Sequence, residues 1–418
     1  MGAQDSRPLL IVVGSSYMEY REYIFAAARE RYRLWLFNPV EPTWAKAYVE
    51  SYSIVNCMDA AAITAAAREV AAQHEVAGFF CYDEAFIEPA AHASAAMGFH
   101  TLDPVAVANC RDKSTTRALV EGTGVRQPKS RPVATLEDAR AAAEEFGYPV
   151  ILKPRNLGAS LGVVIAERPE DLAARFELTN GTRLPGVREF DEYVIVEEFI
   201  EGPEISVDCI VYEGTCHVVV VARKIRGTEP PFEFEEIGHD VAGTDPFLDD
   251  PDLAGQLQRI HEVLGFRNGM THTEFKLTPR GLYLIEVNAR MGGGKIPYLG
   301  QLATGVDATL AAAAVAIGQA PDVRRSDERK CASIRSVFPP FDMEVTRVTV
   351  RDDLAGPPIR EVVGVAKPGM KVRLPPHGMS HSGFVVAVAD TIEESHAAVA
   401  KIDHLIQVDG IALEPPGP

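Results

Sequence analysis

Residues 271–290 read THTEFKLTPRGLYLIEVNAR and contain the clearest pattern in the chain. Two largely apolar segments flank a three-residue turn that ends in glycine, which is typical of a β-hairpin. If Thr278 pairs with Leu282, Glu274 lies directly opposite Glu286, with about 5 Å between the two Cβ atoms. The pattern therefore predicts two carboxylates that face each other on one side of a sheet.

Facing carboxylates need a cation between them, because like charges directly opposite each other destabilise a sheet. The period of two in a strand also places Asn288 and Arg290 on the face of Glu286. Carboxylate and amide oxygens are the ligands that Mg²⁺ prefers, so we expect Glu274, Glu286 and Asn288 to bind it. An accidental acidic pair on a solvent-facing strand fits less well, because the intervening residues are apolar: Leu277, Ile285 and Val287.

A lysine followed by a glycine-rich loop lies upstream of the hairpin. Lys153 ends the apolar run VILK, and two glycines and a serine follow within 156–162. Glycines let backbone N–H groups approach phosphate oxygens, and the ammonium group adds a point charge. The alternative is an ordinary hairpin beside a surface lysine, since the loop is not the GxxxxGK[ST] motif. The segment EEFIEGPE at 197–204 could offer backbone groups to a base and a carboxylate to a ribose.

The N-terminal part of the chain alternates short apolar runs with alanine-rich segments. The runs cover 9–13, 34–37, 53–57 and 78–82, and segments such as 59–73 and 85–97 suit helices. That alternation predicts a parallel α/β sheet. Ligands bind at the carboxyl ends of such strands, which draws attention to Gly14–Ser16 and to Asp83–Glu84. The first of these turns lacks the GxGxxG motif, which disfavours a dinucleotide-binding Rossmann domain.

Beyond residue 111 the pattern predicts a mixed α+β region. Helices are expected from 111 toward 122–124 and over 136–146, and strands over 149–154, 163–166, 193–201 and 205–212. The Pro- and charge-rich stretch 224–257 has little periodicity and is expected to form surface loops. Strand-like runs and one helix over 392–406 indicate a small C-terminal domain. We therefore expect domains at 1–110, at 111–330 with a small nucleotide lobe over 111–197, and at 331–418.

Composition narrows the classes of partner. The 418 residues carry 41 basic and 59 acidic side chains, for a net charge of -18, and such a field repels a phosphate backbone. Nucleic acid is therefore not an expected partner. No stretch approaches the roughly 18 apolar residues of a membrane span, so no membrane partner is expected either. The six cysteines are scattered without a CxxC pair, which indicates reduced thiols in a cytoplasmic protein.

The order of these motifs resembles a known family. Lys113 comes first, followed by Lys153 with its glycine loop, EEFIEGPE, Glu274 and EVNAR at 286–290. The set resembles the ATP-grasp superfamily of carboxylate-amine ligases over essentially the whole chain. THTEFKL…LIEVNARMGGG is most similar to the L-amino-acid ligases that make dipeptides, including those of peptide-antibiotic pathways. The resemblance implies an ATP-grasp fold of α/β and α+β class. It would have an α/β N-terminal domain, a central two-lobed ATP-grasp domain and a small, mostly β C-terminal domain.

The resemblance also implies a reaction and its cofactors. The expected reaction joins an amino acid or related acid to an amine or a second amino acid through an acylphosphate, giving ADP and phosphate. ATP and Mg²⁺ are the expected cofactors, with Mn²⁺ as an alternative metal. The expected partners are amino-acid-like small molecules, together with a second copy of the chain in a homodimer.

Roles for individual residues follow from the same resemblance. The phosphates of ATP would contact Lys113, Lys153 and the loop of Gly158, Ser160 and Gly162. The adenine would lie against the hinge of Glu197, Glu198, Phe199 and Ile200, and the ribose against Glu204. Arg290 would hold the reacting carboxylate, and Glu236 or His239 would take the proton of the amine. Glu84, Gly293 and Gly294 would contact the substrates, and the small residue at 294 would leave room for a larger first substrate.

Three alternatives stay open. A purine-pathway carboxylase or a formate-dependent transformylase would share the nucleotide site but use bicarbonate or formate. A nucleotide-binding regulatory protein would keep the fold without catalysis, and the full set of Glu274, Glu286, Asn288 and Arg290 argues against it. A Rossmann-type oxidoreductase is weakened by the missing glycine motif.

Overall fold

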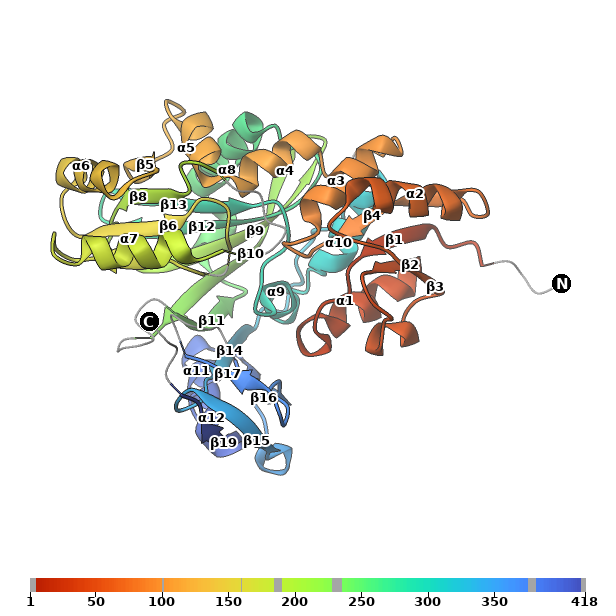
Figure 1. The fold of residues 1–418 in the computed structure, drawn as a ribbon. Coiled ribbons are helices and arrows are strands. Elements are labelled where there is room, and N and C mark those ends of the chain that lie inside the picture. The colour runs from red at the N-terminus through yellow and green to blue at the C-terminus, as the bar shows by residue number, and fades with distance from the viewer. Residues whose placement is uncertain are drawn as a thin grey trace.

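The N-terminal region forms a four-stranded parallel sheet of order β3-β2-β1-β4. The computed structural model describes residues 5–99, 101–158, 160–183, 190–227, 235–374 and 381–414 (Figure 1). The elements of this region are β1 (Leu9–Val13), α1 (Met18–Arg31), β2 (Arg33–Asn38), η1 (Trp44–Ala47), β3 (Ser51–Ile54), α2 (Ala60–Ala71), β4 (Val76–Cys81) and α3 (Ile87–Ala96). Strand β1 is buried along its whole length, as its unbroken apolar run requires in a parallel sheet. The predicted parallel α/β sheet is confirmed.

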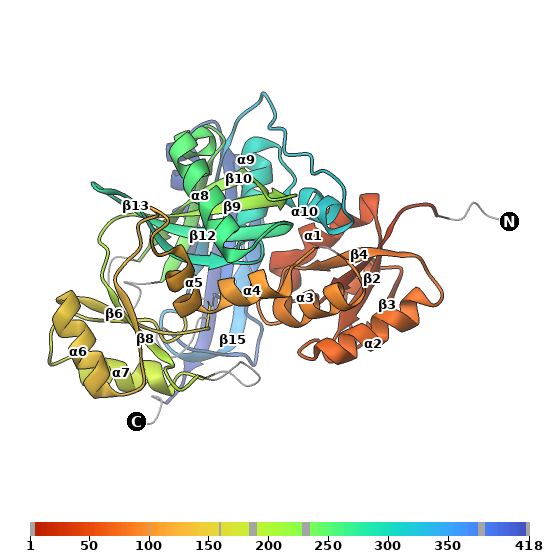
Figure 2. The ribbon, with the colours of Figure 1, turned by 90° about the horizontal axis from the view of Figure 1, so that it is seen from above.

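A second, antiparallel sheet has the order β5-β8-β6-β7. Its elements are β5 (Ser130–Val133), α6 (Leu136–Phe146), β6 (Val150–Pro154), β7 (Val164–Ala166), α7 (Leu172–Gly181) and β8 (Val194–Glu198). Both helices pack on the sheet around a core of their own that includes Ala142, Leu152 and Phe176. Figure 2 shows this small lobe at the opposite end of the molecule from the N-terminal sheet.

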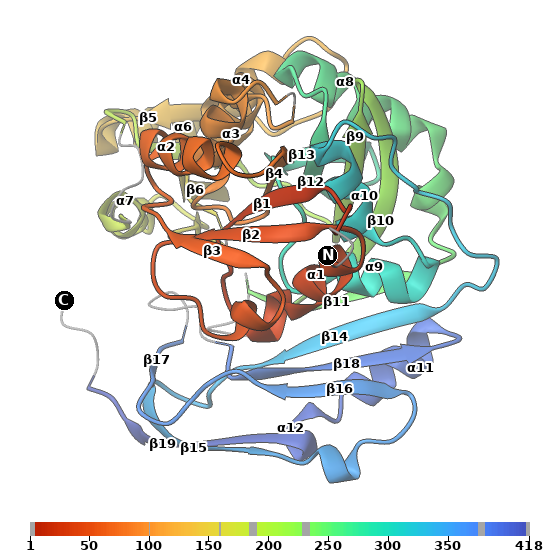
Figure 3. The ribbon, with the colours of Figure 1, turned by 90° about the vertical axis from the view of Figure 1, so that its right-hand side faces the viewer.

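The third sheet has eight strands in the order β13-β12-β9-β10-β11-β14-β18-β16. The strands are β9 (Glu204–Tyr212), β10 (Thr215–Arg226), β11 (Glu236–Ala242), β12 (Gly269–Thr278), β13 (Gly281–Asn288), β14 (Cys331–Val337), β16 (Ile359–Gly364) and β18 (Gly383–Ala389). It runs without a break from the central region into the C-terminal region, where β14, β18 and β16 lie side by side (Figure 3). The domain boundaries at 110 and 330 stay predictions, but the second of them falls within one continuous sheet.

The hairpin of β12 and β13 brings the expected residues together through a different register. Thr278 pairs with Gly281 rather than with Leu282, so the register predicted at the turn was wrong. The register then shifts by one residue between Glu274 and Phe275, and that irregularity restores the pairing of Glu274 with Glu286. A bulge of this kind re-aims the side chains beyond it, which explains why the carboxylates still face each other.

Two other predictions along the chain were wrong. The stretch 224–257 is not loop throughout: it holds the end of β10, strand β11, the short η2 (Pro246–Asp249) and the start of α8 (Pro251–Leu264), while 228–234 lie outside the described residues. The predicted helix over 392–406 is α11 (Ile392–Val399) and α12 (Ile402–Leu405), followed by β19 (Ile406–Ala412). Strand β11 pairs with β10 and β14, and β19 pairs with β15 (Met343–Val350). These strands are stabilised by pairing with other strands, and their own sequences show no clear alternation of apolar and polar residues.

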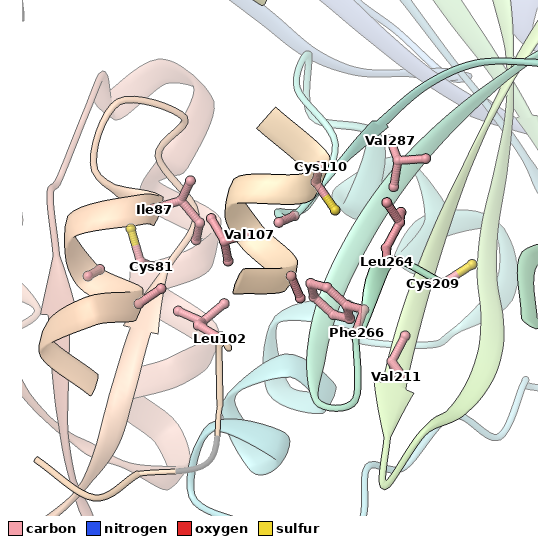
Figure 4. Packing of buried hydrophobic residues seen from close by; sticks show 14 of the residues in the cluster. Cys81, Ile87, Leu102, Val107, Cys110, Cys209, Val211, Leu264, Phe266 and Val287 are labelled. Carbon is pink, nitrogen blue, oxygen red and sulfur yellow. The ribbon is translucent and has the colours of Figure 1, made fainter. Parts of the chain in front are cut away.

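Helices α4 (Pro104–Arg111) and α5 (Lys113–Val120) connect the N-terminal sheet to the central one. Figure 4 shows Leu102 and Val107 between Ile87 on one side and Phe266 on the other, within a single buried cluster. A second buried cluster lies on the opposite faces of these two sheets and includes residues of α9 (Ile296–Thr304) and α10 (Ala308–Ala316). The carboxyl ends of β1 and β4 are therefore fixed relative to the central sheet.

The C-terminal region is completed by a three-stranded sheet of order β17-β15-β19, in which β17 covers Lys371–Val372. The short η3 (Asp352–Leu354) follows β15. Within the ranges given above, no single helix is long and apolar enough to cross a membrane. The pair of α9 and α10 passes that test only when the two are counted together, by length and composition, and it is bent by 111° at the break.

Candidate active site

A cavity of about 420 Å³ lies between α1, the small lobe and the central sheet. Most of the predicted site residues line it: Lys113, Lys153, Ser160, Glu197, Glu198, Phe199, Ile200, Glu204, Glu236, His239, Glu274, Glu286, Asn288, Arg290, Gly293 and Gly294. Three predicted residues do not line it: Glu84, Gly158 and Gly162. The structure thus gathers side chains from the start of α1, the small lobe and the eight-stranded sheet around one space.

Two lysines from different elements are held close to the glycine loop. Asp112 caps the start of α5 and receives two hydrogen bonds from the guanidinium of Arg155, at 2.7 and 2.8 Å. This pairing fixes the next residue, Lys113, whose Nζ donates to the carbonyl oxygen of Leu157 at 2.6 Å. Lys153 reaches the same cavity from the end of β6. Both ammonium groups are buried, so a phosphate bound here would meet cations with little competing water.

The side chain of Glu197 holds Lys153 in place. Its Oε2 lies 2.6 Å from Nζ of Lys153, and its Oε1 accepts from Nε of Arg117 at 3.0 Å. Burial by itself raises the pKa of Glu197, but Arg117 and Lys153 outweigh that effect and lower the pKa to about 2. Burial lowers the pKa of Lys153 in turn, and Glu197 opposes that shift. In the predicted hinge, the amide of Glu198 donates to the carbonyl oxygen of Lys129 at 2.9 Å, so that N–H is not free for a base.

The facing carboxylates carry cations on both sides. Glu274 Oε1 lies 2.8 Å from Nζ of Lys224, and Glu286 Oε1 lies 3.2 Å from Nζ of Lys113. Together with the amide oxygen of Asn288 they form an oxygen-only donor set in the cavity that Lys113 and Lys153 also line. Among the described residues, no three His, Cys, Asp or Glu side chains are grouped so as to hold a metal by themselves. The set therefore suits Mg²⁺ that completes its coordination with substrate phosphates, the usual mode for this ion.

Lys224 was not predicted, because it fell in the stretch expected to be loop. It lies on β10 with its Nζ at 2.7 Å from Glu204, 3.1 Å from Glu236 and 2.8 Å from Glu274. Burial lowers the pKa of Lys224, but these three carboxylates raise it well above its usual value. The predicted ribose contact, Glu204, also lies 3.4 Å from Nζ of Lys276. The sequence signal that was available is the charged pair Arg223–Lys224, which directly follows the valine-rich run at 218–222.

A buried histidine and aspartate were also missed. His272 Nδ1 lies 2.7 Å from Oδ1 of Asp208, and His272 Nε2 lies 3.3 Å from Oε1 of Glu274. Burial lowers the pKa of His272, but Asp208 and Glu274 raise it to about 9. The imidazolium is thus a second cation behind Glu274, and it helps to hold the pKa of that carboxyl well below its usual range. The sequence does place His272 two residues before Glu274, on the same face of the strand, but its partner Asp208 lies on β9, which is distant in the chain.

Arg290 is oriented from the N-terminal region. Its Nε donates to a carboxylate oxygen of Glu84, and its Nη1 donates to the carbonyl oxygen of Met291 at 2.9 Å. Glu84 in turn accepts from Nη1 of Arg111 at 2.9 Å. The structure therefore places Glu84 behind Arg290, outside the cavity lining, and its predicted contact with substrate stays a prediction. Gly294 lies next to His239: a Cβ there would come within 3.2 Å of the imidazole Cε1.

The two candidate bases lie on the same strand, β11. His239 Nε2 approaches Oε1 of Glu236 to 2.6 Å, although this nitrogen is not aligned for a hydrogen bond. Burial raises the pKa of Glu236, but His239 and Lys224 lower it far below its usual value. Glu235, which was not predicted, also lines the cavity, and burial together with Glu236 raises its pKa to about 7. A carboxyl that titrates near neutrality is a further candidate for proton transfer.

Comparison with known proteins agrees with this geometry. Residues 146–297 match the family described as an ATP-grasp domain. Alanine-anticapsin ligase from Bacillus subtilis is 34% identical over 245 residues, which cover 52% of this chain and 50% of that protein. The chain thus spans about half the length of the curated relatives of this kind that it matches.

Two solved structures are similar over nearly the whole chain. L-amino acid ligase from Bacillus licheniformis superposes with a TM-score of 0.79 at 20% identity, covering 98% of this chain and 100% of that one. Phosphoribosylglycinamide synthetase from Anaerococcus prevotii gives a TM-score of 0.72 at 18% identity, covering 97% and 100%. At these identities the likeness concerns the fold, and it confirms the predicted three-part architecture.

Proposed function

Because this chain is an ATP-grasp domain protein, we propose that it is an ATP-dependent ligase that joins a carboxylic acid to an amine through an acylphosphate. The acid is an amino acid or a related acid, the amine belongs to a second amino acid or another amine, and the by-products are ADP and phosphate. One observation carries the proposal: the facing carboxylates Glu274 and Glu286, the guanidinium of Arg290 and buried lysines surround a single cavity. The similarity to alanine-anticapsin ligase supports an amino acid as one substrate.

The residues that would hold Mg²⁺ are Glu274, Glu286 and Asn288. Bound there, the ion would neutralise charge on the phosphoryl oxygens during transfer. The chain has its own cations at the same place, since Lys224 and Lys113 lie against the two carboxylates. These ion pairs hold both carboxylates at the wall of the cavity, where they can act as ligands.

The first step makes the acid reactive. A carboxylate oxygen of the substrate attacks the γ-phosphorus of ATP, the new O–P bond forms, the bond to the β,γ-bridging oxygen breaks, and ADP leaves. Lys113 and Lys153 hold the phosphates, and Arg290, oriented by Glu84, holds the carboxylate in line with them. Glu197 keeps Lys153 pointed at the cavity before the nucleotide arrives.

The second step forms the amide. The amine attacks the acyl carbon, a tetrahedral oxyanion forms, and the C–O bond to phosphate then breaks. Arg290 and the backbone N–H groups of Gly293 and Gly294 are the donors available to that oxyanion. The ammonium proton of the attacking group passes to a base on β11, for which Glu236, His239 and Glu235 are the candidates.

The test is phosphate release from ATP and Mg²⁺ in the presence of amino acids, singly and in pairs, with bicarbonate and formate as further acids. The proposal expects release that needs two substrates, together with a condensed product of the matching mass and stoichiometric ADP. Release that depends on bicarbonate or formate would instead indicate one of the other ATP-grasp ligases. Binding of ATP without any turnover across the panel would contradict the proposal and favour a nucleotide-binding regulatory protein.

A further inference from the structure

The cations that line the cavity differ in one respect. Seven lysines and arginines line it, and six of them have a carboxylate within 4 Å: Lys113, Lys153, Lys224, Arg226, Lys276 and Arg290. The seventh, Arg21, forms no ion pair with any acidic side chain in the described part of the chain. A guanidinium without a counter-ion at the wall of a substrate cavity is suited to bind an anionic group of a ligand.

The surroundings of Arg21 hold it in place while using few of its donors. Its guanidinium carbon lies 5.4 Å from the centre of the Tyr82 ring, a cation-π contact. The Tyr82 hydroxyl is fixed in turn, because it donates to the carbonyl oxygens of Gly14 and Ser15 at 3.1 and 3.0 Å. Among the described residues, the hydrogen bond from Arg21 Nη1 to the carbonyl oxygen of Gly292 is long, at 3.5 Å, and the hydroxyl of Tyr23 also interacts with the guanidinium. Most of the five N–H donors of the guanidinium are therefore available to a ligand.

The position of Arg21 relates it to the second step of the reaction. Arg21 contacts Gly292, two residues beyond Arg290, while the candidate base His239 lies against Gly294. Two residues span at most about 7 Å of chain. That length suits a small molecule with a carboxylate at one end and an amine at the other, each making one hydrogen bond. An α-amino acid with its carboxylate on Arg21 would present its amine toward His239.

We propose that Arg21 binds the carboxylate of the amine-donating substrate and thereby selects α-amino acids over simple amines as acceptors. The inference rests on the proposed ligase function and defines the class of its second substrate. Arg290 has a separate task, because it is oriented toward the acid that becomes the acylphosphate and is already paired with Glu84. The two arginines thus sort the two carboxylates that a dipeptide-forming reaction must keep apart.

The experiment uses matched acceptors with one fixed donor acid: an α-amino acid, its primary amide, and the amine that lacks the carboxyl group. The variants are Arg21→Met, Arg21→Lys and, as a control on the same helix, Arg31→Met, since Arg31 is exposed. Loss of a charged hydrogen-bonding partner should raise the KM of Arg21→Met for the amino-acid acceptor by about 10- to 100-fold. The KM values for ATP and for the donor should stay near those of the wild type. Arg21→Lys should recover part of the loss, and Arg31→Met should match the wild type.

The amide and the plain amine provide the decisive contrast. The wild type should prefer the free amino acid over both, and Arg21→Met should use all three about equally. An unchanged acceptor KM in Arg21→Met, or a raised KM for the donor instead, would overturn the assignment. If Arg21→Met does not fold, the acceptor KM and the discrimination of Arg21→Lys decide in its place. Failure of the ligase function would look different, because the wild type itself would then give no condensed product with any pair, and the inference would fall with it.

Discussion

His272 and Asp208 form a buried pair, 2.7 Å from Nδ1 to Oδ1, directly behind the carboxylate of Glu274. The other carboxylate oxygen of Asp208 accepts the backbone N–H of Gly292 at 3.0 Å. One aspartate on β9 is therefore bonded both to the loop at 291–294, which borders the cavity, and, through His272, to a predicted metal ligand. These contacts connect the backbone at Gly292 to the carboxylate of Glu274 through two buried side chains.

Asp208→Asn should lower activity without preventing nucleotide binding. The amide keeps the size of the side chain but removes the charge that holds His272 and presents only one acceptor oxygen. Replacing outer partners of metal ligands typically costs about 10- to 100-fold in activity or metal affinity, and we expect a kcat reduction in that range. Steady-state kinetics with varied Mg²⁺ would measure it. A suitable control is Asp245→Asn, a buried aspartate that pairs with Arg223, and equal losses in both variants would contradict the prediction.

Arg290→Ala should abolish most of the turnover. In the proposed mechanism its guanidinium donates to the developing oxyanion, and removing such a donor costs about 100- to 1000-fold in kcat. Glu84→Gln should have a smaller effect in the same direction, because it loosens Arg290 without removing it. Rates of phosphate release for both variants would test this order. The exposed Arg324, which pairs with the nearby Asp322, provides a control, and its alanine variant should match the wild type.

Acid should weaken the fold through Glu197. Its pKa lies near 2 in the folded chain and near 4.5 when unfolded, so it stabilises the fold above about pH 4.5. That contribution is lost as the pH falls from about 4.5 to 2, because the unfolded chain then binds the proton more readily. Urea unfolding at several pH values measures the free energy of unfolding. Across this window it should change less steeply with pH in Glu197→Gln than in the wild type. At neutral pH the same variant should be less stable by about 3 to 5 kcal/mol, since Lys153 and Arg117 lose their buried partner. An equal pH dependence in the variant and the wild type would contradict the stabilising role of Glu197.

Lys224→Met should destabilise the protein in a way that Mg²⁺ partly reverses. The substitution leaves Glu204, Glu236 and Glu274 close together without their shared ammonium group, which costs about 3 to 5 kcal/mol. A divalent cation bound at Glu274 would restore part of the lost charge. Thermal unfolding with and without Mg²⁺ should therefore show a larger rise in Tm for the variant than for the wild type. An equal rise in both proteins would count against cation binding there.

The part of the site that could be predicted is the part that is local in sequence. The hairpin of β12 and β13 lies in one short segment, so its turn and its alternation could predict two strands with Glu274 near Glu286. The pairing of these two residues was predicted through a turn register that proved wrong, and it holds because of an irregularity beside Phe275 that leaves no mark on the apolar pattern. The alternating apolar runs before residue 83 likewise predicted the parallel sheet, since each strand and its helix lie in one short segment.

The missed residues depend on contacts between distant strands. Asp208 reaches His272 only because β9 lies beside β12, and no spacing in the sequence brings them together. Lys224 was hidden because β10 and β11 interrupt their apolar runs with charges, which resembles a loop. Several of those charged residues line the cavity, including Lys224, Arg226 and Glu236, so residues of the candidate site are the ones that obscure the strand pattern. Arg21 lies in a helix whose sequence gives no sign that one of its arginines lines the cavity.

The continuity of the eight-stranded sheet limits how this protein could be rebuilt by recombination. Strand β11, which carries both Glu236 and His239, has β14 as its outer neighbour. A chimaera joined at residue 330 would replace that neighbour with a foreign strand, or would leave the edge of β11 open to pairing with other chains. Exchange of the C-terminal region between relatives would therefore alter acid-base chemistry as well as architecture, and a functional crossover would have to carry β11 and β14 together.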